Sequence, residues 1–363
     1  MDALSVCAVL ARAPELCAAH VQALVAAAGG DITRSIELDA LAAVDLPPAA
    51  RASLVFPDST TLDSDLRWIR ASGAQLLAST DTDYPALLKS VANAPPVLFV
   101  LGDPRTLAAP QLAMVGARKG SIRGCRIAGE FARYLVRAGL TITSGLAMGI
   151  DAASHAGALA GGGATVAVCA TGLDRVYPTQ HAALAARIRD RGALVSEFPP
   201  GTPPRQLNFP LRNRLISGLS RGVLVVEAAV QSGSLITASH AVKQGREVFA
   251  VPGCTGDPLC GGCHKLIREG ATLVEEPAQV LSKLKIPLPN EALVRRKGRG
   301  GARAAMDKGY EMLLDAVGFE PATIDVIGVR TGLSGETIAS MLLVLELEGR
   351  IAPYPGGRFG RIP

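Results

Sequence analysis

Apolar and polar residues alternate along residues 76–286 in a way that predicts a layered α/β domain. Short runs of β-branched and other apolar residues are separated by longer segments whose apolar residues recur at helical spacing. This alternation is typical of a doubly wound, mostly parallel sheet. The predicted strands are Val97–Leu101, Leu112–Val115, Leu140–Thr143, Thr165–Cys169, Ala193–Ser196, Gly222–Val226, Glu247–Ala250 and Thr272–Val274.

The patterns on either side of this α/β domain predict three further parts. Residues 1–75 are rich in Ala and Leu at helical spacing, which predicts a small bundle of short helices suited to docking or capping. Residues 287–305 are a polar linker rich in Gly and Arg. Residues 306–363 predict a winged helix. Its expected elements are helices at Glu311–Val317, Thr323–Val329 and Gly335–Glu348, followed by a hairpin at Arg350–Arg361.

Composition narrows the class of protein. A chain of 363 residues that is 48% hydrophobic can fill more than one core, and its net charge of +5 mildly favours polyanions. Aromatic residues make up only 4%, which argues against a platform for stacking bases. The seven cysteines are scattered and odd in number, so they do not form a disulfide framework. With no signal peptide and no apolar stretch long enough for a bilayer, we expect a cytoplasmic protein without membrane contact.

The segment Met114–Gly120 carries the clearest chemical signal. It changes from an apolar strand into a loop where Gly116 allows a tight turn, and where Arg118 and Lys119 place two cations beside backbone amides. An amphipathic helix follows, so N–H groups and the positive end of a helix dipole are directed at one point, which suits a phosphate. The dinucleotide fingerprint G-x-G-x-x-G is missing from this loop. We therefore expect phosphate binding without a cofactor.

Several other loops that follow predicted strands are also rich in Gly, Ser and Thr. Ligands of doubly wound sheets bind beyond the carboxyl ends of the strands, so these loops predict one phosphate-binding face. Arg212 and Arg214 point in different directions on a helix, and the alternative is that one of them pairs with a carboxylate such as Glu227. The candidate contacts are Gly116, Arg118, Lys119, Ser144, Gly145, Gly172, Arg212, Ser232, Gly233, Ser234 and Thr237.

The chain carries a series of motifs in a fixed order: Tyr84-Pro85, Pro95-Pro96-Val97-Leu98, Val115-Gly116-Ala117-Arg118, SGLAMGIDAASH at 144–155, TGLDRVYP at 171–178, FPLRNRLISGLS at 209–220, EAAVQSGSLITA at 227–238 and GREVFAVPG at 245–253. Together these motifs resemble the DprA family (DNA-processing protein A, also called Smf) over almost the whole chain. The resemblance implies an extended Rossmann domain that binds single-stranded DNA and helps load RecA during natural transformation. It also implies a homodimer, and commonly a helical domain before the Rossmann domain, of SAM or helix-hairpin-helix type, and a winged helix after it.

The resemblance assigns individual roles as well. It places the phosphate-gripping arginine of the family at Arg118. The family often has a second basic residue just after its Tyr-Pro, where this chain has Thr179, and the candidate substitutes are Arg175 and His181. The G-x-N-x-L-I motif of the family reads GCHKLI at 262–267, which makes Lys265 a candidate backbone contact. Tyr177, Phe198 and Phe209 are candidates for stacking one base each.

A nucleotide-processing hydrolase on the same fold, of the phosphoribohydrolase type, is the alternative function. Related Rossmann proteins that cleave N-glycosidic bonds carry a P-G-G-x-G-T-x-x-E loop, and the corresponding segment 231–240 of this chain contains no carboxylate. We therefore expect binding rather than catalysis, with Asp151 orienting its own loop. The acid–base groups near strand ends are Asp151, His155, Asp174, Glu197 and Glu227.

Two further clusters of residues raise the questions of a zinc site and of a nucleic-acid contact in the linker. Cys254, Cys260, Cys263 and His264 are zinc-type ligands, but adjacent Cys and His residues rarely bind one ion together, so we expect no metal. The basic residues of the linker are expected to be solvated rather than bound to nucleic acid. They are Arg295, Arg296, Lys297, Arg299 and Arg303.

The winged helix invites a duplex-DNA interpretation. Its third helix carries Glu336, Glu346 and Glu348 and no Lys or Arg, whereas a helix that reads the major groove needs cations. Contact with protein or a capping role is therefore expected, and only Arg358 and Arg361 in the hairpin favour DNA.

Overall fold

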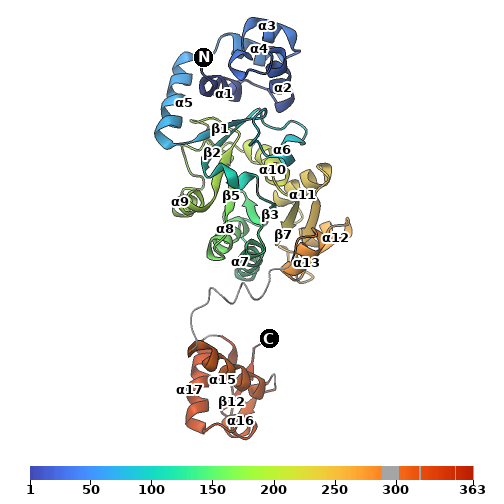
Figure 1. The fold of residues 1–363 in the computed structure, drawn as a ribbon. Coiled ribbons are helices and arrows are strands. Elements are labelled where there is room, and N and C mark those ends of the chain that lie inside the picture. The colour runs from blue at the N-terminus through green and yellow to red at the C-terminus, as the bar shows by residue number, and fades with distance from the viewer. Residues whose placement is uncertain (288–301, 319, 348, 363) are drawn as a thin grey trace. The chain divides into compact units, whose positions relative to one another are not determined.

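The computed structural model describes residues 1–287, 302–318, 320–347 and 349–362, and it contains two compact units, Met1–Pro289 and Asn290–Pro363 (Figure 1). Most of the predicted linker, with Arg295, Arg296, Lys297 and Arg299, lies outside the described residues. No helix in the described part of the chain is both long and apolar enough to cross a bilayer.

The first unit begins with short helices, as the Ala- and Leu-rich pattern predicts. Asp2 caps the first of them by accepting a hydrogen bond from the Ser5 amide, and Asp58 caps the fifth. Their apolar faces pack together around Leu10, Leu24 and Leu41. The helices are α1 (Ala3–Arg12), α2 (Ala18–Ala27), α3 (Leu38–Ala43), α4 (Pro48–Val55) and α5 (Ser59–Ser72), with a 3₁₀ turn at Ile32–Arg34.

A nine-stranded sheet forms the centre of the first unit, in the order β1-β2-β6-β5-β4-β3-β7-β8-β9. All eight predicted strands are confirmed, with ends that differ by at most one residue. Strands β3 to β9 pair in parallel, and β2 pairs antiparallel with both β1 and β6. The strands are β1 (Gln75–Ala78), β2 (Val97–Gly102), β3 (Gln111–Val115), β4 (Thr141–Ser144), β5 (Thr165–Val168), β6 (Ala193–Ser196), β7 (Gly222–Val225), β8 (Glu247–Ala250) and β9 (Thr272–Leu273).

Strand β1 is the element that the sequence did not predict. It begins at Gln75, where helical residues were expected to end, and Ala78 pairs with Val97 of β2. Four residues without apolar–polar alternation give no local signal, so the strand is defined by its partner. This pairing joins the N-terminal helices to the sheet within one compact unit.

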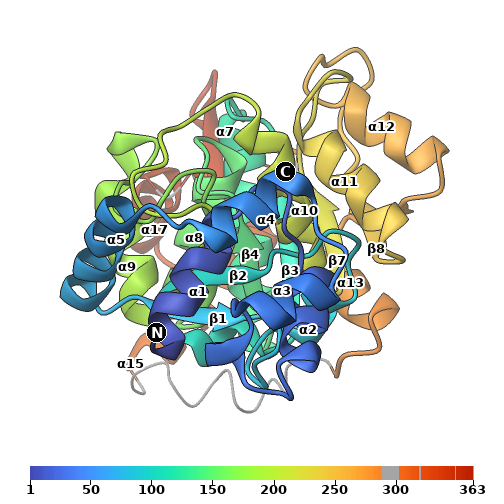
Figure 2. The ribbon, with the colours of Figure 1, turned by 90° about the horizontal axis from the view of Figure 1, so that it is seen from above.

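Helices cover both faces of the sheet, as expected for a doubly wound fold (Figure 2). One face packs against α6, α10, α11 and α12, and the other against α7, α8, α9 and α13. Alternate residues of a central strand enter opposite cores: Met114 packs with α7 and Val115 with the α10 side. The helices are α6 (Ala86–Lys89), α7 (Ile122–Arg137), α8 (Ile150–Ala160), α9 (Ala182–Arg191), α10 (Asn208–Gly218), α11 (Ser234–Lys243), α12 (Gly261–Arg268) and α13 (Pro277–Lys283), with 3₁₀ turns at Pro104–Leu107 and Thr179–His181.

The second unit has the three helices and the hairpin of the predicted winged helix. The predicted first helix was too short, because α15 already starts at Ala302, inside the expected linker, where alanines favour helix. Ile338, Leu342 and Leu345 are buried as predicted, and Met341 packs against them. The elements are α15 (Ala302–Val317), α16 (Ile324–Thr331), α17 (Gly335–Leu347) and a sheet of β10 (Ala322–Thr323), β12 (Arg358–Arg361) and β11 (Ile351–Tyr354).

The close packing of α7 on α8 depends on Gly157, and this generates a test. A Cβ atom at Gly157 would overlap the carbonyl oxygen of Gly129, whereas a Cβ at Gly129 would meet only the Ala153 oxygen at 3.7 Å. Gly157→Ala should lower the free energy of unfolding by about 1–3 kcal/mol, because the two helices must separate. Gly129→Ala should leave it unchanged or raise it by up to about 1 kcal/mol, because alanine favours helix. Urea denaturation measures both, and equal stabilities of the two variants would contradict the packing argument.

Candidate functional site

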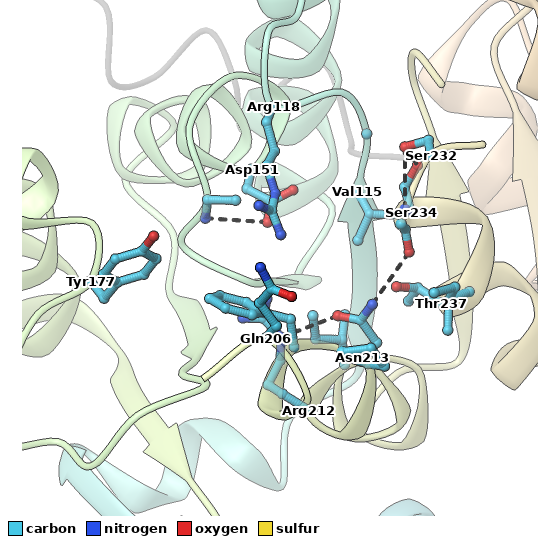
Figure 3. Close-up of a pocket in the computed structure, with 17 residues that line it drawn as sticks. Val115, Arg118, Asp151, Tyr177, Gln206, Arg212, Asn213, Ser232, Ser234 and Thr237 are labelled. Atoms are coloured by element: carbon cyan, nitrogen blue, oxygen red, sulfur yellow. Dashed lines mark hydrogen bonds between the residues drawn. The ribbon is translucent and has the colours of Figure 1, made fainter. Parts of the chain in front are cut away.

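The strand order creates a crevice between β3 and β7. From β3 the chain continues outward through β4, β5 and β6, then returns through α10 to β7 on the other side of β3. At such a switch point the loops after the two central strands diverge, which leaves room for a ligand beyond their carboxyl ends. A cavity of about 610 Å³ lies there. Its lining comes from the loop after β3 and from the starts of α8, α10 and α11 (Figure 3).

The loop after β3 is fixed at both ends by Glu227, which follows β7. The Glu227 carbonyl accepts a hydrogen bond from the Ala117 amide at 2.7 Å. Its carboxylate accepts one from the Ser121 amide at 2.8 Å and one from the Ser121 hydroxyl at 2.6 Å. Ser121 is also the N-cap of α7. Glu227 thus holds the loop at Ala117 and at Ser121, and the residues between them include Arg118 and Lys119.

Arg118 is the cation that faces the cavity (Figure 3). It is exposed, its guanidinium carbon lies 5.2 Å from the centre of the Phe209 ring, and it has no ion pair within the described residues. The Phe209 ring in turn lies 5.8 Å from the Tyr177 ring at a tilt of 54°. A guanidinium over an aromatic face is held in place while its N–H groups stay available to an anion.

The loop after β4 is organised by a buried pair of opposite charges. Asp151 accepts hydrogen bonds from the amides of Gly145 and Ala147, at 3.1 and 3.4 Å, which confirms that it orients its own loop. Arg212 donates to the carbonyls of Gly145 and Val168. Burial raises the pKa of Asp151, and the Arg212 guanidinium opposes that shift. This pair therefore ties α8, α10 and the loop together.

Two predicted contacts beside this loop, one at the end of β4 and one on α10, have partners inside the protein. Ser144 is fully buried, and its hydroxyl donates to the Met114 carbonyl at 2.6 Å, so it joins β4 to β3 instead of facing a ligand. Arg212 borders the cavity but is only 5% exposed and is committed to the scaffold by its hydrogen bonds to backbone carbonyls. Both therefore remain predicted phosphate contacts whose polar groups already have partners inside the protein, because sequence alone does not distinguish a strand-end hydroxyl or a helix arginine that faces inward.

The N-terminus of α11 forms another wall of the cavity. The hydroxyls of Ser232 and Ser234 lie 2.7 Å apart, and the Ser234 amide donates to Ser232 at 3.3 Å. Asn213 of α10 donates to the Gly233 carbonyl, which links the two helices. Thr237, one turn into α11, also lines the cavity. Ser232, Gly233, Ser234 and Thr237 thus gather where the positive end of the helix dipole meets the cavity, and their contact with phosphate stays a prediction.

Gly149 allows the close approach of the start of α8 to the Arg118 loop. Its φ of 76° is unfavourable for residues with a side chain, and a Cβ there would meet the carbonyl oxygens of Ala117 and Arg118. The Ile150 amide donates to the Ala117 carbonyl at 3.2 Å. The positive end of α8 is thereby placed beside Arg118.

Other predicted contacts lie outside the cavity lining. Lys119 is exposed next to Arg118. Gly172 donates its amide to Thr202, and Arg175 pairs with Asp174 at 2.8 Å. Lys265 lies on α12, 3.9 Å from Glu269, and borders a second cavity beside α11. Thr179 starts a 3₁₀ turn and does not line the cavity. Its candidate substitutes, Arg175 and His181, do not line it either, and His181 contacts the Leu146 carbonyl at 2.8 Å.

The structure also brings in residues that sequence reasoning missed. Gln206 and Asn213 place amide groups in the lining, and Ile236 adds an apolar contact (Figure 3). Asn213 lies inside the motif FPLRNRLISGLS, so the motif itself was an available signal. Gln206 comes from an irregular segment before α10, where nothing in the sequence marks it.

The candidate acid–base groups do not form a catalytic pair in the described residues. Arg214 pairs with Glu197, which confirms the alternative that one arginine of α10 pairs with a carboxylate, although the partner is Glu197 and not Glu227. Asp174 accepts from the Gly201 amide. His155 is fully buried beside Thr165. Of the five groups, Asp151 alone borders the cavity.

The cysteines considered for zinc are arranged around α12. Cys263 is buried against the carbonyls of Val225 and Val226, His264 contacts the Gly253 carbonyl at 3.0 Å, and Cys254 is exposed. Among the described residues, no three His, Cys, Asp or Glu side chains gather in a way that would hold a metal ion.

Comparison with known proteins identifies the family of this site. The family described as DNA recombination-mediator protein A matches residues 75–285, and the DprA winged helix domain matches residues 299–357. The chain is also 43% identical over 315 residues to Protein Smf of Escherichia coli, covering 85% of this chain and 83% of that protein. The chain belongs to the DprA family. In this DprA-family chain, the two family matches thus cover both the sheet with its cavity and the winged helix.

Other DprA relatives are similar over smaller parts. The DNA processing protein DprA of Bacillus subtilis is 41% identical over 216 residues, covering 59% of this chain and 73% of that protein. The crystal structure of DprA from Streptococcus pneumoniae matches with a TM-score of 0.66 at 35% identity, covering 76% of this chain and 95% of that chain. A structure of DprA from Helicobacter pylori matches with a TM-score of 0.54 at 26% identity, covering 58% of this chain and 95% of that chain.

His155, on α8 of this DprA-family chain, predicts a pH dependence of stability. The Thr165 hydroxyl donates to the Ile142 carbonyl, so it accepts from His155 Nδ1, and Nε2 is buried without a partner. Burial lowers the pKa of His155 from 6.5 to about 3. The neutral ring therefore contributes stability above pH 6.5 that is lost as the pH falls towards 3, roughly 2 kcal/mol by pH 5. In His155→Gln, the fall in unfolding free energy between about pH 7.5 and 5 should be smaller by that amount. An identical fall in both proteins, measured by urea denaturation, would show that His155 is not responsible.

Proposed function

We propose that this chain binds single-stranded DNA through its phosphate backbone at the cavity between β3 and β7. The observation that carries the proposal is Arg118: an exposed guanidinium, stacked on Phe209 at the cavity and without an ion pair among the described residues. A cation that the scaffold holds but does not neutralise is suited to an external anion.

Electrostatics at the cavity supports an anionic ligand. The N-termini of α8 and α11 both point at it, and each carries the positive end of a helix dipole. Asp151 is the acidic residue in the described lining, and its carboxylate is occupied by two backbone amides. The proposal also agrees with the Helicobacter pylori relative, whose structure is described as showing a single-stranded DNA binding mode.

The tilted pair of Tyr177 and Phe209 supports single-stranded over duplex DNA. Both rings border the cavity, where an unpaired base has a face to stack on. Bases within a duplex are stacked on each other and do not offer that face. Backbone contacts with a small contribution from stacking predict little sequence preference and strong salt dependence.

We extend the proposal to the role that the family resemblance implies, the loading of RecA onto the bound strand by a homodimer. Two copies on one strand would raise the effective concentration of each site for the DNA. The winged helix fits a protein contact better than duplex recognition, since α17 contains Glu336 and Glu346 and Arg361 pairs with Asp315. Glu348 lies outside the described residues.

A hydrolase is the second candidate, and the geometry favours it less. The Glu227 carboxylate accepts both donors of Ser121 and does not border the cavity. A catalytic carboxylate must be within reach of substrate. Release of free base from a panel of mononucleotides, lost in Glu227→Gln, would overturn the proposal of a binding protein without catalysis.

Removing the Arg118 charge tests the proposed site. Arg118→Ala should weaken binding of a labelled single-stranded oligonucleotide by at least about tenfold, roughly 1.4 kcal/mol, and reduce the salt slope by about 0.7. Arg118→Lys should recover part of the affinity, because it keeps the charge and loses the planar stacking on Phe209. Fluorescence anisotropy over a salt series, with single-stranded and duplex oligonucleotides, measures this.

Arg221 offers a matched control for that measurement. It is exposed and precedes β7, at the end of the strand opposite the cavity, so Arg221→Ala removes the same charge from another part of the sheet. It should bind like the native chain. Equal losses in the two variants, or a preference for duplex, would contradict the proposed site.

RecA loading predicts an effect beyond binding. The native chain should shorten the lag before RecA hydrolyses ATP on a single-stranded oligonucleotide, and Arg118→Ala should not, since the strand is no longer held. Tight binding of the strand without any change in the lag would separate the two parts of the proposal and remove the second.

A further inference from the structure

The outer face of α7 carries a straight row of arginines that begins beside the cavity. Arg123, Arg126, Arg133 and Arg137 are all exposed. At about 100° per residue, their positions fall within an arc of roughly 80°. The buried residues of α7, Phe131 and Leu135 among them, occupy the opposite side.

These four arginines have no neutralising partner in the structure. Within the described residues, none of them forms an ion pair or a side-chain hydrogen bond. Glu130 lies on the same face between Arg126 and Arg133, yet it too forms no ion pair there. The adjacent helix α8, which packs closely on α7, carries one acidic residue, Asp151, and that residue is buried. The row is thus a strip of net positive charge, which Glu130 offsets only in part.

The row is continuous with the cavity along the chain. Arg118 lies three residues before Ser121, the N-cap of α7, and Lys119 is exposed between them. Because Glu227 holds both ends of this loop, Arg118 has a fixed place at the start of the helix. From Arg123 to Arg137 the helix rises by about 21 Å. Positive charge therefore runs from the cavity along one rigid element.

We propose that the arginine row of α7 (Arg123, Arg126, Arg133 and Arg137) is a second contact surface for single-stranded DNA, which carries the backbone of the strand as it leaves the cavity. The inference rests on the proposed function, because it extends the track that starts at Arg118. Its basis is charge complementarity with a polyanion and continuity with the Arg118 loop. Arginine suits this role, since it binds phosphate oxygens in two-point fashion and stays charged.

The length of the DNA oligonucleotide distinguishes binding at the arginine row from binding at the cavity. The variant replaces the four arginines of the row by glutamine, which has similar helix propensity. Anisotropy is measured with an oligonucleotide of about six nucleotides, inside the range of about 4–16 nucleotides that single-strand binding sites cover, and with one of about twenty-four, which is longer than that range. The short strand should bind the variant like the native chain. The long strand should bind more weakly, with a salt slope smaller by about 3, roughly 0.7 for each phosphate that the variant no longer neutralises.

A matched control removes four exposed arginines from other helices, Arg67 of α5 and Arg187, Arg189 and Arg191 of α9. The change in net charge is the same, so an equal loss with the long strand would overturn the row as a specific surface. A milder pair, Arg133→Gln with Arg137→Gln, covers the case in which the fourfold variant does not fold. It should weaken binding of the long strand alone.

The remaining outcomes distinguish this inference from the proposed function. If the row variant binds the long strand like the native chain while Arg118→Ala loses binding, the row is overturned and the cavity stands. If Arg118→Ala binds both strands normally but the row variant does not, the row stands as a site of its own and its continuity with the cavity is wrong. If neither variant changes binding, both proposals fail.

Discussion

The Glu227 carboxylate is the contact on which the site depends. It accepts the amide and the hydroxyl of Ser121, and through Ser121 it fixes the first turn of α7. Hydrogen bonds to a charged group each contribute about 1.5–3 kcal/mol, more than neutral ones. Because its backbone carbonyl also holds Ala117, one residue at the end of β7 sets the position of the whole loop after β3. The two strands that flank the cavity are thereby joined where a ligand would enter.

The buried pair of Asp151 and Arg212 serves a related purpose at the neighbouring loop. Both side chains are nearly removed from water, which is unfavourable for isolated charges. The cost is offset because each charge meets backbone groups: two amides for Asp151 and two carbonyls for Arg212. These contacts satisfy the amides of Gly145 and Ala147 and the carbonyl of Gly145, backbone groups of an irregular loop that no strand or helix pairs. The arrangement leaves Arg118 as the exposed cation of the described cavity lining.

The N-terminal helices are tied to the same end of the sheet. Arg12 of α1 forms an ion pair with the buried Asp65 of α5 at 2.5 Å and also donates to the Pro200 carbonyl at 3.0 Å. Pro200 lies in the loop after β6, which leads through Gln206 into α10. The N-terminal helices place no charged residue in the cavity lining. They contribute to the site by supporting the loop after β6, which reaches the cavity.

Much of the architecture was determined by local sequence. Eight strands and the winged helix were predicted, because apolar periodicity records which residues leave water, and the glycine-rich loops were located because parallel strands present their carboxyl ends together. Arg118 was found in the same way, as a cation in a strand–loop–helix joint. The sequence alone also carried enough motifs, in order, to indicate the DprA family, and the comparisons confirmed it.

Only the tertiary structure decided which polar side chains face the cavity and which hold the scaffold. Ser144 and Arg212 resemble ligand contacts in sequence, yet they are buried because long-range packing turns them towards Met114, Gly145 and Val168. Likewise β1 exists because β2 supplies its hydrogen bonds. Local sequence specifies the element that carries a side chain. The direction of that side chain, and its partner, depend on residues far away in the chain that only the folded packing brings near.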